Sequence, residues 1–140
     1  MQQLIYTSAA VRPFRWTDLR QILTSARKYN AGNNISGMMV YHVRSILQVL
    51  EGPDEMVDAL FARILRDPRH TALRVISHHR IERREFESWP MGLVKNMRRG
   101  IKAPGFAAYS PVELMSVDYD RAKSLVSMFQ TGPLRRMAER

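Results

Sequence analysis

The spacing of apolar residues changes repeatedly along the chain, and this alternation restricts the fold more than any other feature of the sequence. Strand-like runs, in which side chains alternate between two faces, occupy residues 3–8, 35–43, 45–52, 72–82 and 89–94. Helix-like spacing occupies residues 17–30 and 54–65. The resulting order, βαββαββ, predicts a ferredoxin-like α+β fold, in which one sheet carries two helices on one face.

The ends of the two helical segments carry recognisable signals. Thr17 is placed to cap the start of the first helix, and Gly32 and Asn34 tolerate the left-handed backbone that ends one. Pro53 precedes two acidic residues and favours a helix start, because proline is tolerated in the first turn and acids stabilise the positive end of the helix dipole. This second helix is expected to end near Asp67.

A further helix is predicted in residues 116–132, where Leu125, Val126 and Phe129 give it an apolar side. Pro104 belongs to a connector that precedes it. Two helices cover only one face of such a sheet. A C-terminal helical segment could therefore cover the other face, and it would be a natural element to move.

The chain carries 22 basic and 13 acidic side chains, a formal net charge of +9, which suits attraction to nucleic acid or to an acidic partner. The basic cluster KNMRRGIK at residues 95–102 is interpreted first as a solvated turn and second as a docking patch for an acidic surface. No apolar run approaches the roughly 18 residues of a membrane span. Residues 1–10 do not resemble a secretory signal, and the chain has no cysteine. A cytoplasmic location without membrane association is therefore expected.

Sequence motifs of common enzymes are absent. The sequence contains no GxSxG, HExxH, Walker-type or GxGxxG motif and no cysteine nucleophile. His78 and His79, adjacent on a predicted strand, point to opposite faces and cannot both bind one zinc ion in the usual way. Neither catalysis nor a metal site is expected.

Gln48 interrupts a run of large aliphatic residues in ILQVLEGP at residues 46–53. In a strand its side chain shares a face with Ile46 and Leu50, which is the expected core face. Burying the amide without a partner would cost roughly 1 to 3 kcal/mol. A polar partner is therefore expected: backbone, water, another side chain or a ligand.

Four other side chains attract attention by their placement: Tyr6 on the first strand, Asn30 at the end of the first helix, and Trp89 and Met91 on one face of the last strand. Each alone has a structural explanation. Tyr6, Trp89 and Met91 are typical core residues, and asparagine is common at helix ends. Their combination with Gln48 is more informative than any one of them.

Five segments, taken in order, resemble the BLUF family of blue-light sensors, which bind a flavin, usually FAD. They are LIYTS at 4–8, ARKYNAGNNISGMMVY at 26–41, ILQVLEGP at 46–53, ARILRDPRH at 62–70 and IERREFESWPMGLV at 81–94. The resemblance implies a flavin-binding photosensor domain over residues 1–95. Residues 96–140 then form a C-terminal helical cap or output extension, for which the resemblance offers no motif.

The resemblance also implies roles for individual residues. Tyr6, Asn30 and Gln48 correspond to the family's tyrosine, asparagine and glutamine at the flavin ring. Trp89 and Met91 correspond to the tryptophan and methionine that relay or shape the signal. These five are the expected photoactive and ring-edge residues.

Further cofactor-binding positions follow from the same resemblance. Ser8 matches a serine near the tyrosine, and Ile22 and Ile64 match aliphatic residues that sandwich the ring between the two helices. Arg63 and Asp67 match polar positions toward the ribityl and phosphate side. FAD is the expected cofactor, with FMN as a possible substitute.

The implied mechanism is a reversible switch. The excited flavin takes an electron from Tyr6, a proton follows through the Gln48 amide, and charge recombination leaves a changed hydrogen-bond pattern and a small red shift that darkness reverses. Whether the amide rotates or tautomerises stays open. The signal is expected to pass to a separate downstream protein or to a change in a homo-oligomer.

Pro90 is unusual for the family. Because proline removes a backbone donor, the last strand should be at the sheet edge there or locally irregular.

Two other functions remain as alternatives. A basic ferredoxin-like RNA-binding module would suit the charge, but no RNP1-like pattern occurs on the strands. A small acylphosphatase-like enzyme would need a phosphate-cradling loop, which residues 8–17 do not provide.

Overall fold

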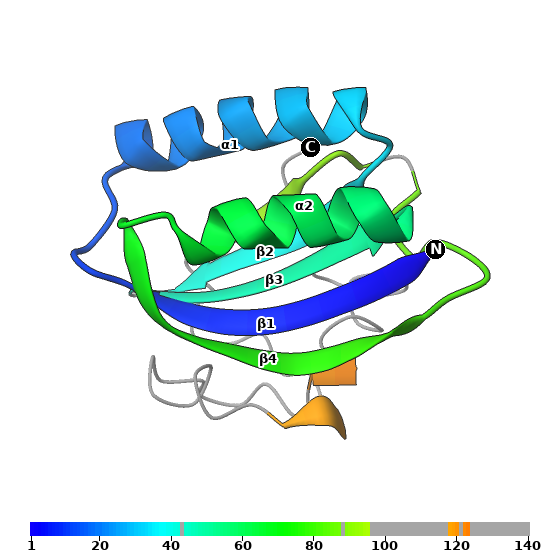
Figure 1. Ribbon diagram of the computed structural model, residues 1–140. Helices are drawn as coiled ribbons and strands as arrows, with labels where there is room; N and C mark the ends of the chain where they lie inside the picture. The colour runs from blue at the N-terminus through cyan, green and yellow to red at the C-terminus, as the bar shows by residue number, and fades with distance from the viewer. Residues whose placement is uncertain (43, 88, 96–117, 121, 124–140) are drawn as a thin grey trace.

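The computed structural model describes residues 1–42, 44–87, 89–95, 118–120 and 122–123. Its elements (Figure 1) are β1 Gln2–Ala10, α1 Trp16–Gly32, β2 Ser36–His42, β3 Ser45–Gly52, α2 Asp54–Leu65, β4 His70–Arg80 and β5 Gly92–Lys95. Their order is βαββαββ, and the predicted ferredoxin-like α+β fold is confirmed. Within these ranges, no helix combines the length and the hydropathy that crossing a bilayer requires.

The strands form one five-stranded sheet in the order β4-β1-β3-β2-β5. β1 pairs antiparallel with β3 and β4, β2 pairs antiparallel with β3, and β5 pairs parallel with β2. Both helices lie on the same face of the sheet (Figure 1). The two strands that carry Tyr6 and Gln48 are therefore neighbours near the middle of the sheet, beneath the helices.

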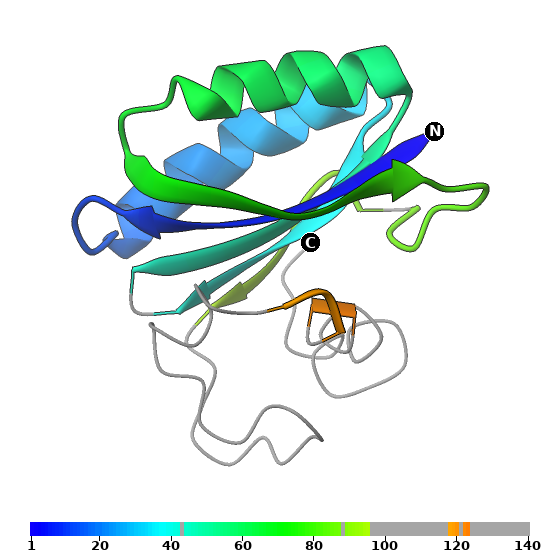
Figure 2. The ribbon, with the colours of Figure 1, turned by 60° about the horizontal axis from the view of Figure 1, so that its bottom comes forward.

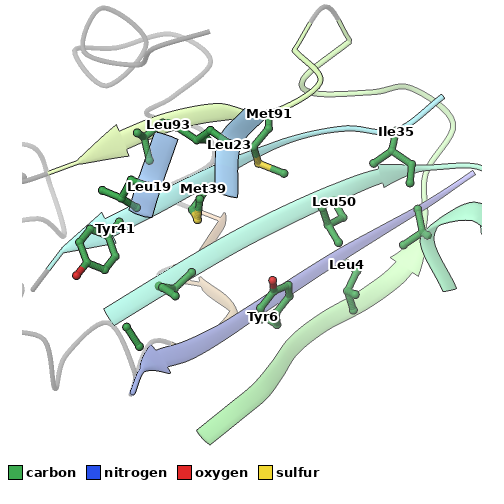
Figure 3. Close-up of a cluster of buried hydrophobic side chains, with 13 residues drawn as sticks. Leu4, Tyr6, Leu19, Leu23, Ile35, Met39, Tyr41, Leu50, Met91 and Leu93 are labelled. Carbon is green, nitrogen blue, oxygen red and sulfur yellow. The ribbon is translucent and has the colours of Figure 1, made fainter. Parts of the chain in front are cut away.

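A hydrophobic core fills the space between the helices and the sheet. Leu4 and Tyr6 of β1 and Leu50 of β3 stand on this face (Figure 3), and Leu19 and Leu23, one helical turn apart, reach it from α1. Each buried leucine contributes about 1.5–3 kcal/mol relative to an exposed one. The apolar side chains that alternate along the strands and those that recur every helical turn thus pack into one core.

The opposite face of the sheet is also buried, since Ile5 and Val49 have no exposed surface. Figure 2 shows the described part of residues 118–123 on that side. Four of these five residues are helical, and Ala122 is buried. The predicted helix over 116–132 otherwise lies outside the described residues. Outside them too lie the predicted connector with Pro104 and the apolar side of the predicted helix, formed by Leu125, Val126 and Phe129. The same holds for residues 96–102 of the predicted basic cluster.

The start of α1 differs from the prediction. The helix begins at Trp16 with Arg15 as its N-cap residue, so Thr17 does not cap it. The Arg15 N–H donates to Asp18 Oδ2 at 2.8 Å. A carboxylate three residues after the N-cap is a strong acceptor for this N–H, as in a capping box, and it fixes the helix start two residues earlier.

The predicted strand over 89–94 is confirmed only from Gly92 on, where β5 begins. Its predicted start is wrong, so Trp89 and Met91 precede the strand and do not share a strand face. Pro90 has no N–H to offer a neighbouring strand, so the ladder can begin only after it. The expectation that proline places the last strand at the sheet edge or makes it irregular is confirmed in both respects.

Candidate functional site

A cavity of about 200 Å³ lies between the two helices and the sheet. Its lining combines aliphatic walls, two amides and several charged groups. Eight residues predicted for the site line it: Tyr6, Ile22, Asn30, Gln48, Arg63, Ile64, Asp67 and Met91. They come from β1, β3, both helices and two connecting segments, so the fold brings together positions that are far apart in sequence.

Tyr6 and Gln48 form a hydrogen-bonded pair at this cavity. They are directly opposite each other in the β1–β3 register, so both side chains project from the helix-covered face. The Tyr6 hydroxyl donates to Gln48 Oε1, and Gln48 Nε2 lies 3.7 Å from the Met91 sulfur. The amide therefore has the phenol on one side and a thioether, a weak acceptor, on the other.

The protonation state of Tyr6 follows from its surroundings. The side chain is buried, and burial raises the pKa of the phenol above its ordinary value; the Asp67 carboxylate acts in the same direction. The hydroxyl therefore keeps its proton at neutral pH. It can act as a donor to Gln48 and as the source of a transferable proton.

This raised pKa predicts a loss of stability in alkali. Because the folded-state pKa of Tyr6 lies above the unfolded value of about 10, its contribution is fully present below pH 10 and is lost as the pH rises further. Above that pH the group should lower the free energy of unfolding by about 1.4 kcal/mol per pH unit. Urea unfolding between pH 8 and 11 should show a shallower decline in Tyr6→Phe. If the unfolding free energy fell equally with pH in the wild type and in Tyr6→Phe, the raised pKa of Tyr6 would be contradicted.

Two side chains of α1 hold the segment that precedes β5. Asn30 Nδ2 donates to Pro90 O at 2.6 Å, and Arg27 Nε donates to Met91 O at 2.9 Å. These bonds replace the strand pairing that Pro90 prevents. They keep Met91 buried at the cavity.

Asn30 also leaves one group unsatisfied. The residue is completely buried and lines the cavity, yet its Oδ1 has no hydrogen-bond partner within the described part of the chain. An orphaned buried acceptor costs about 1–3 kcal/mol. This oxygen is therefore available to a ligand that offers an N–H or O–H group.

The charged part of the lining comes from α2 and the loop that follows it. The Arg63 guanidinium carbon lies 4.4 Å from the centre of the Tyr29 ring. Arg69 donates from Nε to both Asp67 oxygens, at 2.9 and 3.0 Å. These bonds hold the pKa of Asp67 below its usual range, so the carboxylate stays ionised. Exposed guanidinium groups beside an apolar cavity suit a ligand with an anionic arm.

Two predicted residues do not line the cavity. Ser8 is completely buried, with its hydroxyl 2.9 Å from His70 Nδ1, and His70 in turn lines the cavity. Trp89 is buried outside it, and its carbonyl accepts the Gly37 N–H at 2.9 Å. Ser8 is therefore linked to the cavity through His70.

Nine lining residues were not predicted, among them Tyr29, Arg69 and His70. Arg27, which supports the site by donating to Met91 O, was not predicted either. Arg69 and His70 directly follow Asp67 and Pro68 in the segment ARILRDPRH, so that motif contained a signal for them. Nothing in the local sequence of Arg27 indicates that it reaches a carbonyl 64 residues away.

The family model for sensors of blue light using FAD matches residues 1–92. The chain belongs to the BLUF family. The beta subunit of photoactivated adenylate cyclase from Euglena gracilis is 35% identical over 85 residues, which cover 61% of this chain and 10% of that protein. The antirepressor BluF of Escherichia coli (strain K12), regulated by blue light and temperature, is 29% identical over 52 residues, or 37% of this chain and 13% of that protein. This BLUF chain spans about a tenth of the length of these curated relatives.

Solved structures of BLUF proteins share the fold of this chain. The ground state of BlsA superposes with a TM-score of 0.82 at 26% identity, covering 95% of this chain and 89% of that one. The dark state of BlrB superposes with a TM-score of 0.65 at 27% identity, covering 97% and 92%. BLUF domains bind a flavin and sense blue light without catalysis of their own. The RNA-binding alternative has no support among these relatives.

Proposed function

We propose that this chain is a blue-light photoreceptor whose cavity holds FAD, with FMN as the alternative, and in which Tyr6, Gln48 and Met91 convert excitation into a conformational signal. The supporting observation is the hydrogen-bonded Tyr6–Gln48 pair at the cavity. The donor set of the cavity suits an isoalloxazine, whose polar edge has carbonyl and ring-nitrogen acceptors and one imide donor. The unpartnered Asn30 Oδ1 suits that donor.

The binding roles follow from the lining. The amides of Asn30 and Gln48 would meet the polar edge, and Ile22 and Ile64 would form the apolar walls. Arg63 and Asp67 would lie toward the ribityl and phosphate arm, and the unpredicted Arg69 joins them. Ser8 contributes by positioning His70.

When bound, the flavin supplies blue-light absorption and an excited-state electron acceptor. Tyr6 would be the electron donor to that group, and its proton would move along the existing hydrogen bond toward Gln48 Oε1. Once the electron and the proton were back on Tyr6, the Gln48 amide could keep its donor and acceptor groups exchanged, by rotation or by tautomerisation. Met91, whose sulfur now faces Gln48 Nε2, would then face a different group.

The size of this change limits how the signal can spread. One neutral hydrogen bond contributes about 0.5–1.5 kcal/mol net, which shifts an equilibrium by roughly tenfold or less. The responding element must therefore be close to balance in the dark. The segment with Trp89 and Met91 is suited to this, because side chains of α1 and one β2 amide hold its carbonyls in place of a regular ladder.

The output is proposed to leave through the C-terminal segment to a separate protein. Lys123 Nζ lies 3.3 Å from Glu85 Oε1, which joins that segment to the loop leading to Trp89. Residues 1–95 act in this proposal as the photosensor domain and residues 96–140 as the output extension, in a cytoplasmic homo-oligomer without an enzymatic function of its own. Related proteins combine the same domain with cyclases, as in the photoactivated adenylate cyclase of Euglena gracilis.

Absorption spectroscopy tests this proposal. The purified protein should be yellow, or become yellow with added FAD, and blue light should shift its flavin band slightly to the red with full recovery in darkness. Chromatography of the released cofactor separates FAD from FMN. A protein that stays colourless after reconstitution with either flavin, or a yellow protein without a reversible shift, would contradict the proposal.

A further inference from the structure

Glu51 is a buried carboxylate that the proposed photochemistry does not use. It lies on β3, three residues after Gln48, so its side chain projects from the opposite face of the sheet. It has no exposed surface. Its Oε2 accepts the Glu85 N–H and its Oε1 accepts the Phe86 N–H, both at 2.7 Å. Each carboxylate oxygen thus accepts one of two consecutive backbone N–H groups.

The segment that begins at these amides ends at the cavity. The Trp89 N–H donates to Phe86 O at 3.0 Å, and the Gly37 N–H of β2 donates to Trp89 O at 2.9 Å. Two residues later, the Met91 sulfur lies 3.7 Å from Gln48 Nε2. The segment therefore passes from one face of the sheet to the other, and a side chain of β3 holds each of its ends.

The carboxylate is costly to bury, and this cost needs a compensating role. Burial raises the pKa of Glu51, while the two N–H bonds act in the opposite direction by stabilising its ionised form. Hydrogen bonds to an ionised acceptor are about twice as strong as neutral ones. An amide or a protonated acid at this position would have only one oxygen without a proton. It could therefore accept in this way from only one of the two N–H groups.

We propose that Glu51 is a positioning residue for the photochemical site: it fixes the backbone of Glu85 and Phe86 and thereby sets how Met91 packs against Gln48. This inference rests on the proposed role of Gln48. Glu51, on the face of β3 opposite Gln48, would then influence how fast the light-induced state recovers, through segment 85–91.

Glu51→Gln tests the anchor directly, because its amide –NH₂ cannot accept a hydrogen bond. In flavin-loaded protein in darkness, the amides of Glu85 and Phe86 should lose hydrogen-exchange protection by about tenfold or more relative to the amide of Ile5 in the central strand. A loss shared equally with Ile5 would show a global destabilisation and would overturn the proposal. The control is Glu55→Gln, an exposed acid on α2, which should leave all three amides unchanged.

The photocycle gives a second readout that a merely structural role would not move. Dark recovery in Glu51→Gln should change by roughly threefold or more at a temperature where circular dichroism shows a folded protein. Recovery that matches Glu55→Gln would refute the positioning role even if exchange had increased. If the wild-type protein has no photocycle, the proposed function fails, whereas the exchange result still decides whether the anchor exists.

Arg84 offers an independent variant should Glu51→Gln fail to fold. Its guanidinium donates to Asn34 O at 2.6 Å and to Ser36 Oγ at 2.9 Å, and it holds the same segment from a partly exposed position. Arg84→Gln should increase exchange at Glu85 and Phe86 and change the recovery rate in the same direction. Unchanged exchange and recovery in this variant would also overturn the proposal.

Discussion

Gln48→Leu is expected to abolish the reversible red shift while leaving a folded, yellow protein. Leucine matches the aliphatic neighbours Ile46 and Leu50, so the strand can keep its packing. It can neither accept the Tyr6 proton nor exchange a donor for an acceptor. The measurement is the light-minus-dark absorption spectrum of the flavin-loaded variant, together with circular dichroism to verify the fold.

Two companion variants make the Gln48 result specific. Tyr6→Phe should lose the red shift as well, because it removes the hydroxyl that donates to Gln48. Gln21→Leu changes an exposed glutamine on α1 by the same substitution and should keep a normal photocycle. A normal red shift in Gln48→Leu would refute the assigned role of the amide, whatever the other two variants show.

Gly37→Ala is expected to be the most destabilising of the conservative substitutions in the sheet. A Cβ at this position would lie 2.0 Å from Val49 O and 3.1 Å from Val49 C, both backbone atoms of the paired strand. Neither atom can move without separating β2 from β3. We expect a loss of at least about 3 kcal/mol, which is a large part of the 5–15 kcal/mol available to a typical domain. Urea unfolding measures it.

Gly32→Ala is the matched control for that experiment. A Cβ at Gly32, the last residue of α1, meets nothing within 4 Å. Its effect should therefore be neutral or stabilising by about 0.4–1 kcal/mol, through a less flexible unfolded chain. If Gly37→Ala were as stable as Gly32→Ala, the close approach of the two strands would be wrong.

The order of the elements could be predicted because each pattern reports directly on burial. Gln48 was placed correctly on the face of Ile46 and Leu50, since a strand leaves no other choice. The start of α1 shows why capping propensity alone was insufficient. Thr17 is a favoured N-cap residue, but the Asp18 carboxylate accepts the Arg15 N–H and fixes an earlier start. From the sequence, Asn30 is equally consistent with a residue that ends a helix. Only the structure shows that its side-chain amide donates to Pro90 O.

Contacts between distant segments were beyond prediction for a physical reason. Arg27 reaches Met91 and Glu51 reaches Phe86 only after the loop before β5 has packed against the sheet. The sequence identified the proline that disturbs this region but not the groups that replace its missing hydrogen bonds. Such positions depend on the path of an irregular segment, which no periodic pattern describes.

The direct opposition of Tyr6 and Gln48 across β1 and β3 has an evolutionary consequence. Both strands are flanked on each side by another strand, so the separation of phenol and amide is set by the best-protected part of the ladder. Substitutions on the outer strands or on the surface can hardly stretch it. Lineages that diversify this scaffold should therefore preserve the primary light reaction and vary its lifetime and its recipient.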